Sequence, residues 1–163
     1  MSGFGEDTYN LDICVLRKPS TQDAAYLGEE LSKIEPWKTL NSTPQGLADG
    51  FVYEDTSTNT YAVIADEKPV GIISVRYPWL VGPYLGFLGI IPTSQGKGLG
   101  KVLMAWLEKC ARAHSARNIF ICVSSFNDEA HTFYKSCGYL EVANLDGLIV
   151  DGHAELLLRK RLS

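Results

Sequence analysis

The sequence lacks the features that mark membrane and secreted proteins. No stretch approaches the ~20 consecutive apolar residues that a membrane-crossing helix needs, so we expect no membrane partner. The first residues, MSGFGEDTYNLDICVL, contain no basic segment followed by a long apolar one and do not match a signal peptide. A surplus of positive charge is also missing, since the formal net charge is −4. We therefore expect no nucleic acid among the partners of the chain.

Cysteine and histidine are scarce, and their spacing does not favour redox or metal chemistry. The sequence has four cysteines, Cys14, Cys110, Cys122 and Cys137, which form no CxxC pair. Three of the four lie inside apolar runs. We interpret them as reduced thiols of a cytoplasmic protein. The three histidines show no close ligand spacing, so we predict no metal site: His114, His131 and His153.

Length and hydropathy patterns predict one mixed α/β domain. The 163 residues are 45% hydrophobic and 21% charged, which suits a single domain over 1–163, with 1–10 expected to be flexible. Helices are predicted after the capping residues Ser20, Thr43 and Asn127, and after a glycine-rich stretch near position 98. Strands are predicted at 11–17, 60–66, 70–77, 84–91, 118–124, 139–143 and 154–160. The resulting order, β, α, α, β, β, β, α, β, α, β, β, contains a central strand–helix–strand unit.

Three glycines, Gly96, Gly98 and Gly100, lie where a strand ends and a helix begins, in IIPTSQGKGLG. A glycine inside a helix costs about 1 kcal/mol relative to alanine, so three glycines at a predicted helix start indicate another role for this stretch. It lacks the glycine and the hydroxyl residue of a P-loop, and it does not fit G-x-G-x-x-G. A flexible connector and an anion site both stay open. In the second case free amide groups at the helix start hold a phosphate, while Lys97 and Lys101 add positive charge or are merely solvated.

Two motifs together resemble those of the GCN5-related N-acetyltransferase (GNAT) superfamily. IIPTSQGKGLG resembles the Q/R-x-x-G-x-G/A loop of the family, and VSSFNDEAHTFYKSCGY resembles its N-x-x-A-x-x-x-Y-x-x-x-G-F/Y segment. The resemblance implies a mixed, mostly antiparallel central sheet flanked by helices, with a splayed central strand pair. Gly86 and Gly89 would ease that splay, or serve close packing. The resemblance also implies acetyl-CoA as cosubstrate, held by Leu88, Gly89, Ile90, Gln95, Gly96, Lys97, Gly98, Leu99, Gly100, Lys101, Asn127 and Tyr134.

The resemblance implies acetyl transfer from a thioester to a primary amine of a small molecule or peptide by direct attack. Tyr134 is the candidate general acid toward the leaving thiolate, because a phenol with a reference pKa of ~10 is protonated at neutral pH. A tyrosine that only packs its ring on the helix is the alternative. Asn127 is expected to cap its helix and, by resemblance, to contact the cosubstrate.

The sequence departs from the family pattern at the general base. Tyr84 stands where many relatives carry a glutamate, and Cys122 stands where a narrower group of relatives carries one on the next strand. The candidates for the proton acceptor are then water, His153 and Glu155. His153 and Glu155 share a face of a predicted strand, so a surface salt bridge or hydrogen bond between them is the alternative. We take Glu155 as the second catalytic candidate, and we interpret Cys122 as a buried thiol rather than a nucleophile.

Residues 35–50 are rich in loop formers and are expected to wall the acceptor site, as the first two helices do in relatives. We predict that Trp37, Tyr53 and Tyr84 contact the acceptor, although Trp37 also suits a hydrophobic anchor. The chain is expected to act as a monomer or a homodimer. A non-catalytic module that binds acyl-CoA and a protein that binds nucleotide phosphates remain alternatives to the enzyme.

Overall fold

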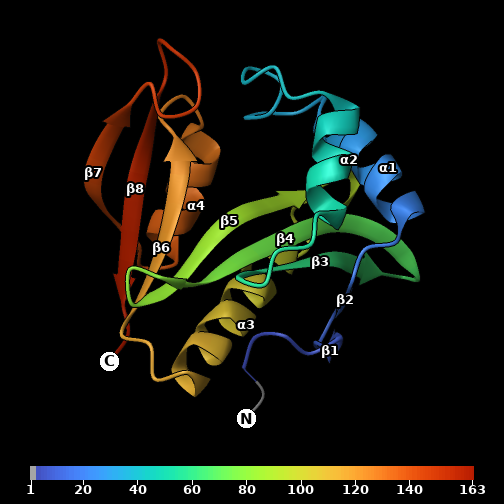
Figure 1. Ribbon diagram of the computed structural model, residues 1–163, viewed down its shortest axis with the longest axis horizontal. Helices are drawn as coiled ribbons and strands as arrows, with labels where there is room; N and C mark the ends of the chain where they lie inside the picture. The colour runs from blue at the N-terminus through green and yellow to red at the C-terminus, as the bar shows by residue number, and fades with distance from the viewer. Residues whose placement is uncertain (1–2) are drawn as a thin grey trace.

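The computed structural model describes residues 3–163, which form one eight-stranded sheet and four α-helices (Figure 1). The elements in chain order are β1 (Thr8–Asn10), β2 (Val15–Arg17), α1 (Thr21–Leu31), α2 (Pro44–Val52), β3 (Thr58–Ala65), β4 (Lys68–Trp79), β5 (Gly82–Ile90), α3 (Leu99–Ala113), β6 (Asn118–Ser124), α4 (Asp128–Ser136), β7 (Leu140–Asp146) and β8 (Ala154–Arg161). A short 3₁₀ turn, Pro92–Ser94, links β5 to the loop before α3. This order confirms the predicted alternation from β2 onward.

The first strand differs from the prediction. The segment 11–17 does not run as one strand, because a turn closed by the Leu11 N–H bonding the Cys14 carbonyl (2.9 Å) precedes β2. Thr8–Asn10 form the additional strand β1, which pairs antiparallel with β2. The flexible segment predicted at 1–10 includes residues 1 and 2, which lie outside the described residues. Within the rest of it, Tyr9 packs edge-on against Tyr61.

Local sequence signals fix the starts of three helices. Ser20 and Asp23 bond each other's backbone in the predicted capping box of α1. The Thr43 hydroxyl accepts from Gly46 N at the start of α2, where Pro44 occupies the first helical position. Asn127 accepts from Ala130 N and begins α4. These three predictions are confirmed, and each cap satisfies an amide that the helix itself leaves free.

The sheet is mostly antiparallel, in the order β1-β2-β3-β4-β5-β6-β8-β7, and its one parallel pair is β5 with β6. That pair meets only at Tyr84–Phe120 and Leu85–Ile121, after which the two strands diverge (Figure 1). Opposite β4, the register skips Gly86, because Ser74 pairs with Phe87 and Val75 with Leu85. The bulge at Gly86 bends β5 at the place where it leaves β6. The predicted splayed central strand pair is therefore confirmed.

Helices cover both faces of the central strands. Figure 1 shows α1 and α2 on one side of β3, β4 and β5, with α3 on the other side. The apolar stripe of α3 is buried through Leu103 and Leu107, and α1 buries Leu27 and Leu31. None of the helices in residues 3–163 is long and apolar enough to cross a membrane. This two-sided burial anchors both the end of β5 and the start of α3, which form the site described next.

Candidate active site

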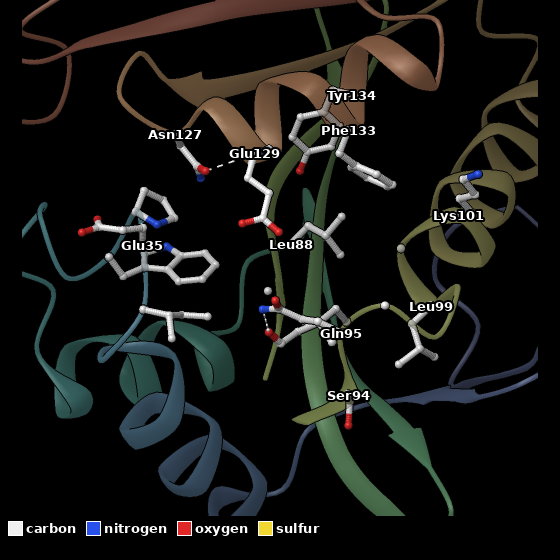
Figure 2. A pocket seen from close by; sticks show the side chains of 18 of the residues that line it. Glu35, Leu88, Ser94, Gln95, Leu99, Lys101, Asn127, Glu129, Phe133 and Tyr134 are labelled. Carbon is white, nitrogen blue, oxygen red and sulfur yellow. Dashed lines mark hydrogen bonds between the residues drawn. The ribbon is translucent and has the colours of Figure 1, made fainter. Parts of the chain in front are cut away.

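A cavity of about 520 Å³ opens between the end of β5, the start of α3, the start of α4 and the loop after α1 (Figure 2). It collects most residues that the sequence predicts for the cosubstrate: Leu88, Gly89, Ile90, Gln95, Gly96, Gly98, Leu99, Gly100, Lys101, Asn127 and Tyr134. Lys97 is exposed and does not belong to the described lining. Two segments about 30 residues apart in the sequence thus face each other across one space.

The glycine loop has a backbone conformation that side chains disfavour. Gly96 has φ 74° and Gly98 φ 84°, both in the left-handed region. A Cβ placed on either glycine would meet no described atom within 4 Å, so the space above the loop is open. Gln95 holds the loop against β5, because its Nε2 donates to the Ile90 carbonyl at 2.9 Å (Figure 2). The loop is therefore fixed in place and accessible from the cavity.

The start of α3 presents free backbone donors to this cavity. Gly98 occupies the N-cap position, and no side chain of the described residues caps α3, unlike α1, α2 and α4. The amides of the first turn are then available to an anion, which the positive end of the helix dipole also attracts. Lys101 lies on the rim of the cavity and adds positive charge (Figure 2). A diphosphate matches this set of donors.

The edge of β5 beside the cavity is not paired with another described strand beyond Leu85, although the Ile90 carbonyl accepts from Gln95. Beyond Leu85, β5 has no pairing with β6 among the described strands, while its other edge remains bonded to β4. Leu88, Gly89 and Ile90 lie on this open stretch and line the cavity. An extended ligand arm with amide groups can therefore pair with β5 as a further strand would.

Tyr134 lies on α4 with its hydroxyl directed into the cavity (Figure 2). Its side chain is buried, and this burial raises the pKa of the phenol well above its usual value. Asn127, one of the other predicted contacts, caps α4 at a distance of 3.3 Å between its Oδ1 and Ala130 N, and it lines the same space. A protonated phenol at this position is able to donate to a group inside the cavity.

A second cavity of about 130 Å³ continues into the gap between β5 and β6. It shares the wall around Leu88, Asn127 and Tyr134 with the larger cavity and adds Tyr84, Cys122, Ser124 and Glu155. Burial raises the pKa of the Cys122 thiol, although its contact with Tyr84 lowers it, so the thiol stays protonated at neutral pH. Burial also raises the pKa of Glu155, against the lowering effect of a hydrogen bond from Ser124.

The predicted acceptor residues lie in different surroundings. Trp37 stacks on Phe87 with ring centroids 4.4 Å apart, and it lines both cavities. Its position is therefore compatible with both predicted roles, hydrophobic anchor and wall of the acceptor site. Tyr84 lines the small cavity. Tyr53 follows α2, is 73% exposed and lies outside the described lining of both cavities. His153 packs against Phe126 rather than pairing with Glu155.

Several residues of the site were not predicted from the sequence. Glu129 of α4 points into the large cavity, and Phe133 closes over Gly100, where an added Cβ would be 3.0 Å from its ring (Figure 2). Glu35 lines the cavity and accepts hydrogen bonds from the Thr39 backbone and hydroxyl. The sequence did contain a usable signal for Glu129 and Phe133, because both lie within about one helical turn of the predicted Tyr134 or of each other.

Comparison with known proteins agrees with this geometry. The model of the Acetyltransferase (GNAT) family matches residues 23–139. Streptothricin acetyltransferase of Streptomyces lavendulae is 31% identical over 108 residues, which cover 65% of this chain and 57% of that protein. The aligned stretch therefore spans little more than half of that relative.

Solved structures show the same fold at low identity. An acetyltransferase from Thermus thermophilus superposes with a TM-score of 0.73 at 18% identity, over 94% of this chain and 100% of that one. A Bacillus anthracis protein in complex with acetyl coenzyme A superposes with a TM-score of 0.61 at 16% identity, over 68% of this chain and 65% of that one. At these identities the likeness establishes the architecture of the sheet and helices.

Proposed function

The chain belongs to the Acetyltransferase (GNAT) family, and from this premise we propose that it transfers the acetyl group of acetyl-CoA to a primary amine of a small molecule or peptide. The observation that carries the proposal is the junction of the two cavities at Tyr134 and Leu88. One cavity has donors for a diphosphate and an open strand edge, and the other contains a buried carboxylate. A donor and an acceptor bound in the two spaces would meet beside one phenol.

The residues present fit acetyl-CoA. The left-handed Gly96 and Gly98 leave the space that side chains would fill, and the uncapped start of α3 offers amides to the diphosphate. The open edge of β5 at Leu88–Ile90 would bind the amide groups of the pantetheine arm. When bound, acetyl-CoA supplies an acetyl thioester, whose carbonyl carbon is the target of an amine.

Tyr134 would protonate the departing sulfur. Its raised pKa keeps the hydroxyl protonated at neutral pH, and because Tyr134 lines both cavities it would lie between a donor and an acceptor bound in them. Water and Glu155 are the two candidates for taking a proton from the amine. The acceptor walls would come from Trp37 and Tyr84, with Tyr53 further out.

The similarity to streptothricin acetyltransferase favours an amine on a small molecule as the acceptor. We propose that the protein is cytoplasmic and acts as a monomer or homodimer, without a nucleic acid, membrane or metal partner. The four thiols, which are free in the structure, suit a reducing compartment.

The test measures thiol release from acetyl-CoA in the presence of polyamines, amino acids, aminoglycosides or peptide N-termini. The enzyme requires release that depends on an acceptor. Binding of acetyl-CoA by calorimetry without release for any amine would support the non-catalytic acyl-CoA module. Stronger thermal protection by ATP or GTP than by acetyl-CoA would support the nucleotide binder.

Tyr134→Phe tests the assigned acid. We expect kcat to fall by about 100-fold or more, as is typical when a general acid is removed, with the Kd for acetyl-CoA retained. Tyr26→Phe, which changes a 45% exposed tyrosine of α1, is the matched control and should leave kcat unchanged. An unaltered kcat in Tyr134→Phe would reject the general-acid role.

A further inference from the structure

Two buried polar side chains meet across neighbouring strands at the wall of the small cavity. Ser124 ends β6, Glu155 lies near the start of β8, and the two are paired in the antiparallel register. The Ser124 hydroxyl donates to Oε1 of Glu155 at 2.6 Å. Their exposed fractions are only 3% and 4%. The carboxylate is therefore held in one position by a partner on the next strand.

The other described side chains that line the small cavity around Glu155 carry no charge. The titratable groups that face it within the described lining are Tyr84 of β5, Cys122 of β6 and Tyr134 of α4. Burial raises the pKa of all three, so they are neutral at pH 7. On the remaining side, β7 places Leu145 opposite Glu155. Glu155 is the one carboxylate of the described residues that line this cavity.

A cation to balance this carboxylate is absent from the described part of the chain. The ion pairs among residues 3–163 involve other acids: Asp7, Asp23, Glu29, Glu30, Asp55 and Glu108. Burial without a cation disfavours the ionised carboxylate and raises its pKa, so a positively charged ligand at this cavity wall would stabilise the ionised form. The apolar and aromatic walls from Trp37, Leu40 and Phe87 suit the carbon chain of such a ligand.

We propose that the acceptor is a primary alkylammonium ion whose charged nitrogen binds Glu155, that Glu155 takes its proton, and that Ser124 is the positioning residue of this carboxylate. This inference rests on the proposed acetyl transfer. It selects Glu155 over water as the proton acceptor. It also defines the acceptor chemically, as an amine on a saturated carbon that arrives protonated at neutral pH.

The protons and electron pairs balance in this scheme. One N–H bond of the ammonium breaks, and its proton passes to the carboxylate of Glu155. The freed nitrogen lone pair forms the bond to the acetyl carbonyl carbon, and the carbon–sulfur bond breaks with its electron pair going to sulfur. The Tyr134 hydroxyl protonates the sulfur, and the second proton released by the nitrogen as the amide forms restores the phenol. Glu155 finally returns its proton to water.

The test compares an alkylamine, which is an ammonium at pH 7, with an arylamine, which is already neutral. In Glu155→Gln we expect kcat/KM for the alkylamine to fall by about 100-fold or more, the usual effect of losing a general base. The loss for the arylamine should be far smaller, because no proton has to leave before attack. Glu141→Gln removes an exposed carboxylate of β7 and should change neither value.

Ser124→Ala tests the positioning role through a pH profile. The hydrogen bond from Ser124 lowers the pKa of Glu155, so its loss should move the acidic limb of kcat/KM to higher pH by about one unit. A residue that only supports the fold would lower activity without moving that limb. The neighbouring exposed Ser125→Ala is the matched control and should keep the profile of the wild type.

Equal losses for both acceptors in Glu155→Gln, or an unmoved limb in Ser124→Ala, would overturn the inference. The wild type gives an independent measurement in case a variant fails to fold. Its kcat/KM for the alkylamine should be bell-shaped, falling below the pKa of Glu155 and above that of the amine. If kcat/KM for the alkylamine instead rose with pH up to the pKa of the amine and did not fall above it, the inference would also be overturned. Thiol release with arylamines alone would reject the alkylammonium while keeping acetyl transfer, whereas no release with any amine would reject the transfer itself.

Discussion

Gly98→Ala separates the conformational role of the glycine loop from its role in binding. Gly98 is the N-cap of α3, with φ 84°, and it lines the large cavity. A methyl group there meets no described atom within 4 Å, so steric overlap inside the protein contributes nothing to the effect. Two consequences remain, which are backbone strain in the free protein and a Cβ where the diphosphate would lie.

The strain has an expected size. A left-handed conformation costs a non-glycine residue about 1–2 kcal/mol, and the lower entropy of the unfolded alanine chain returns about 0.4–1 kcal/mol. The net loss of about 1 kcal/mol should lower Tm by about 2–4 °C for a chain of this length. Gly50→Ala is the matched control: Gly50 lies in α2, has no atom near its Cβ position and is not left-handed. That change should raise stability by about 0.5–1 kcal/mol.

Ligand-linked stability then reports on binding. At a concentration 100 times its Kd, acetyl-CoA should stabilise the folded protein by about 2.7 kcal/mol, which corresponds to an upward Tm shift of about 5–10 °C in differential scanning fluorimetry. Gly50→Ala should keep this shift. Gly98→Ala should lose most of it, because the added methyl group occupies the approach to the first amides of α3. A full shift in Gly98→Ala would refute the assignment of this loop as the diphosphate site.

Two further predictions concern stability alone. Leu80 and Val81 form the exposed two-residue turn between β4 and β5, with φ 41° and 61°. Because a β-branched side chain strongly disfavours positive φ, Val81→Gly should raise the Tm of thermal unfolding by about 2–4 °C. A lower Tm in this variant would contradict the idea that Val81 is strained. Burial alone would raise the pKa of Asp23, but the Arg17 guanidinium and the bonds from Ser20 outweigh it and hold that pKa below its usual value. The stabilisation from this carboxylate is complete above its unfolded pKa and is lost as pH falls through the folded value. Asp23→Asn should thus lower the free energy of unfolding, measured with urea at pH 7, by about 1 kcal/mol. If the difference in this free energy between variant and wild type did not shrink below about pH 4, the ionised carboxylate would not be its cause.

Features that depend on neighbours in the chain were predictable from the sequence. Ser20, Thr43 and Asn127 cap helices because each side chain reaches an amide three residues on. The glycines of the loop before α3 identified a helix start with open backbone, and the structure has that start at Leu99. The spacing from Asn127 to Tyr134 likewise placed both on one short helix, which gave this side of the cavity. Local spacing determined these features because the interactions themselves span only a few residues.

Only the tertiary structure decided how the distant segments meet. The strand order β6-β8-β7 places Glu155 beside Ser124, 31 residues away in the chain, and this contact turned an apparent surface carboxylate into a buried one. The same holds for Trp37, which reaches the cavity by stacking on Phe87, while Tyr53 stays outside it. Register and burial follow from the packing of the whole sheet, and no local pattern encodes the surroundings of a side chain that another strand provides.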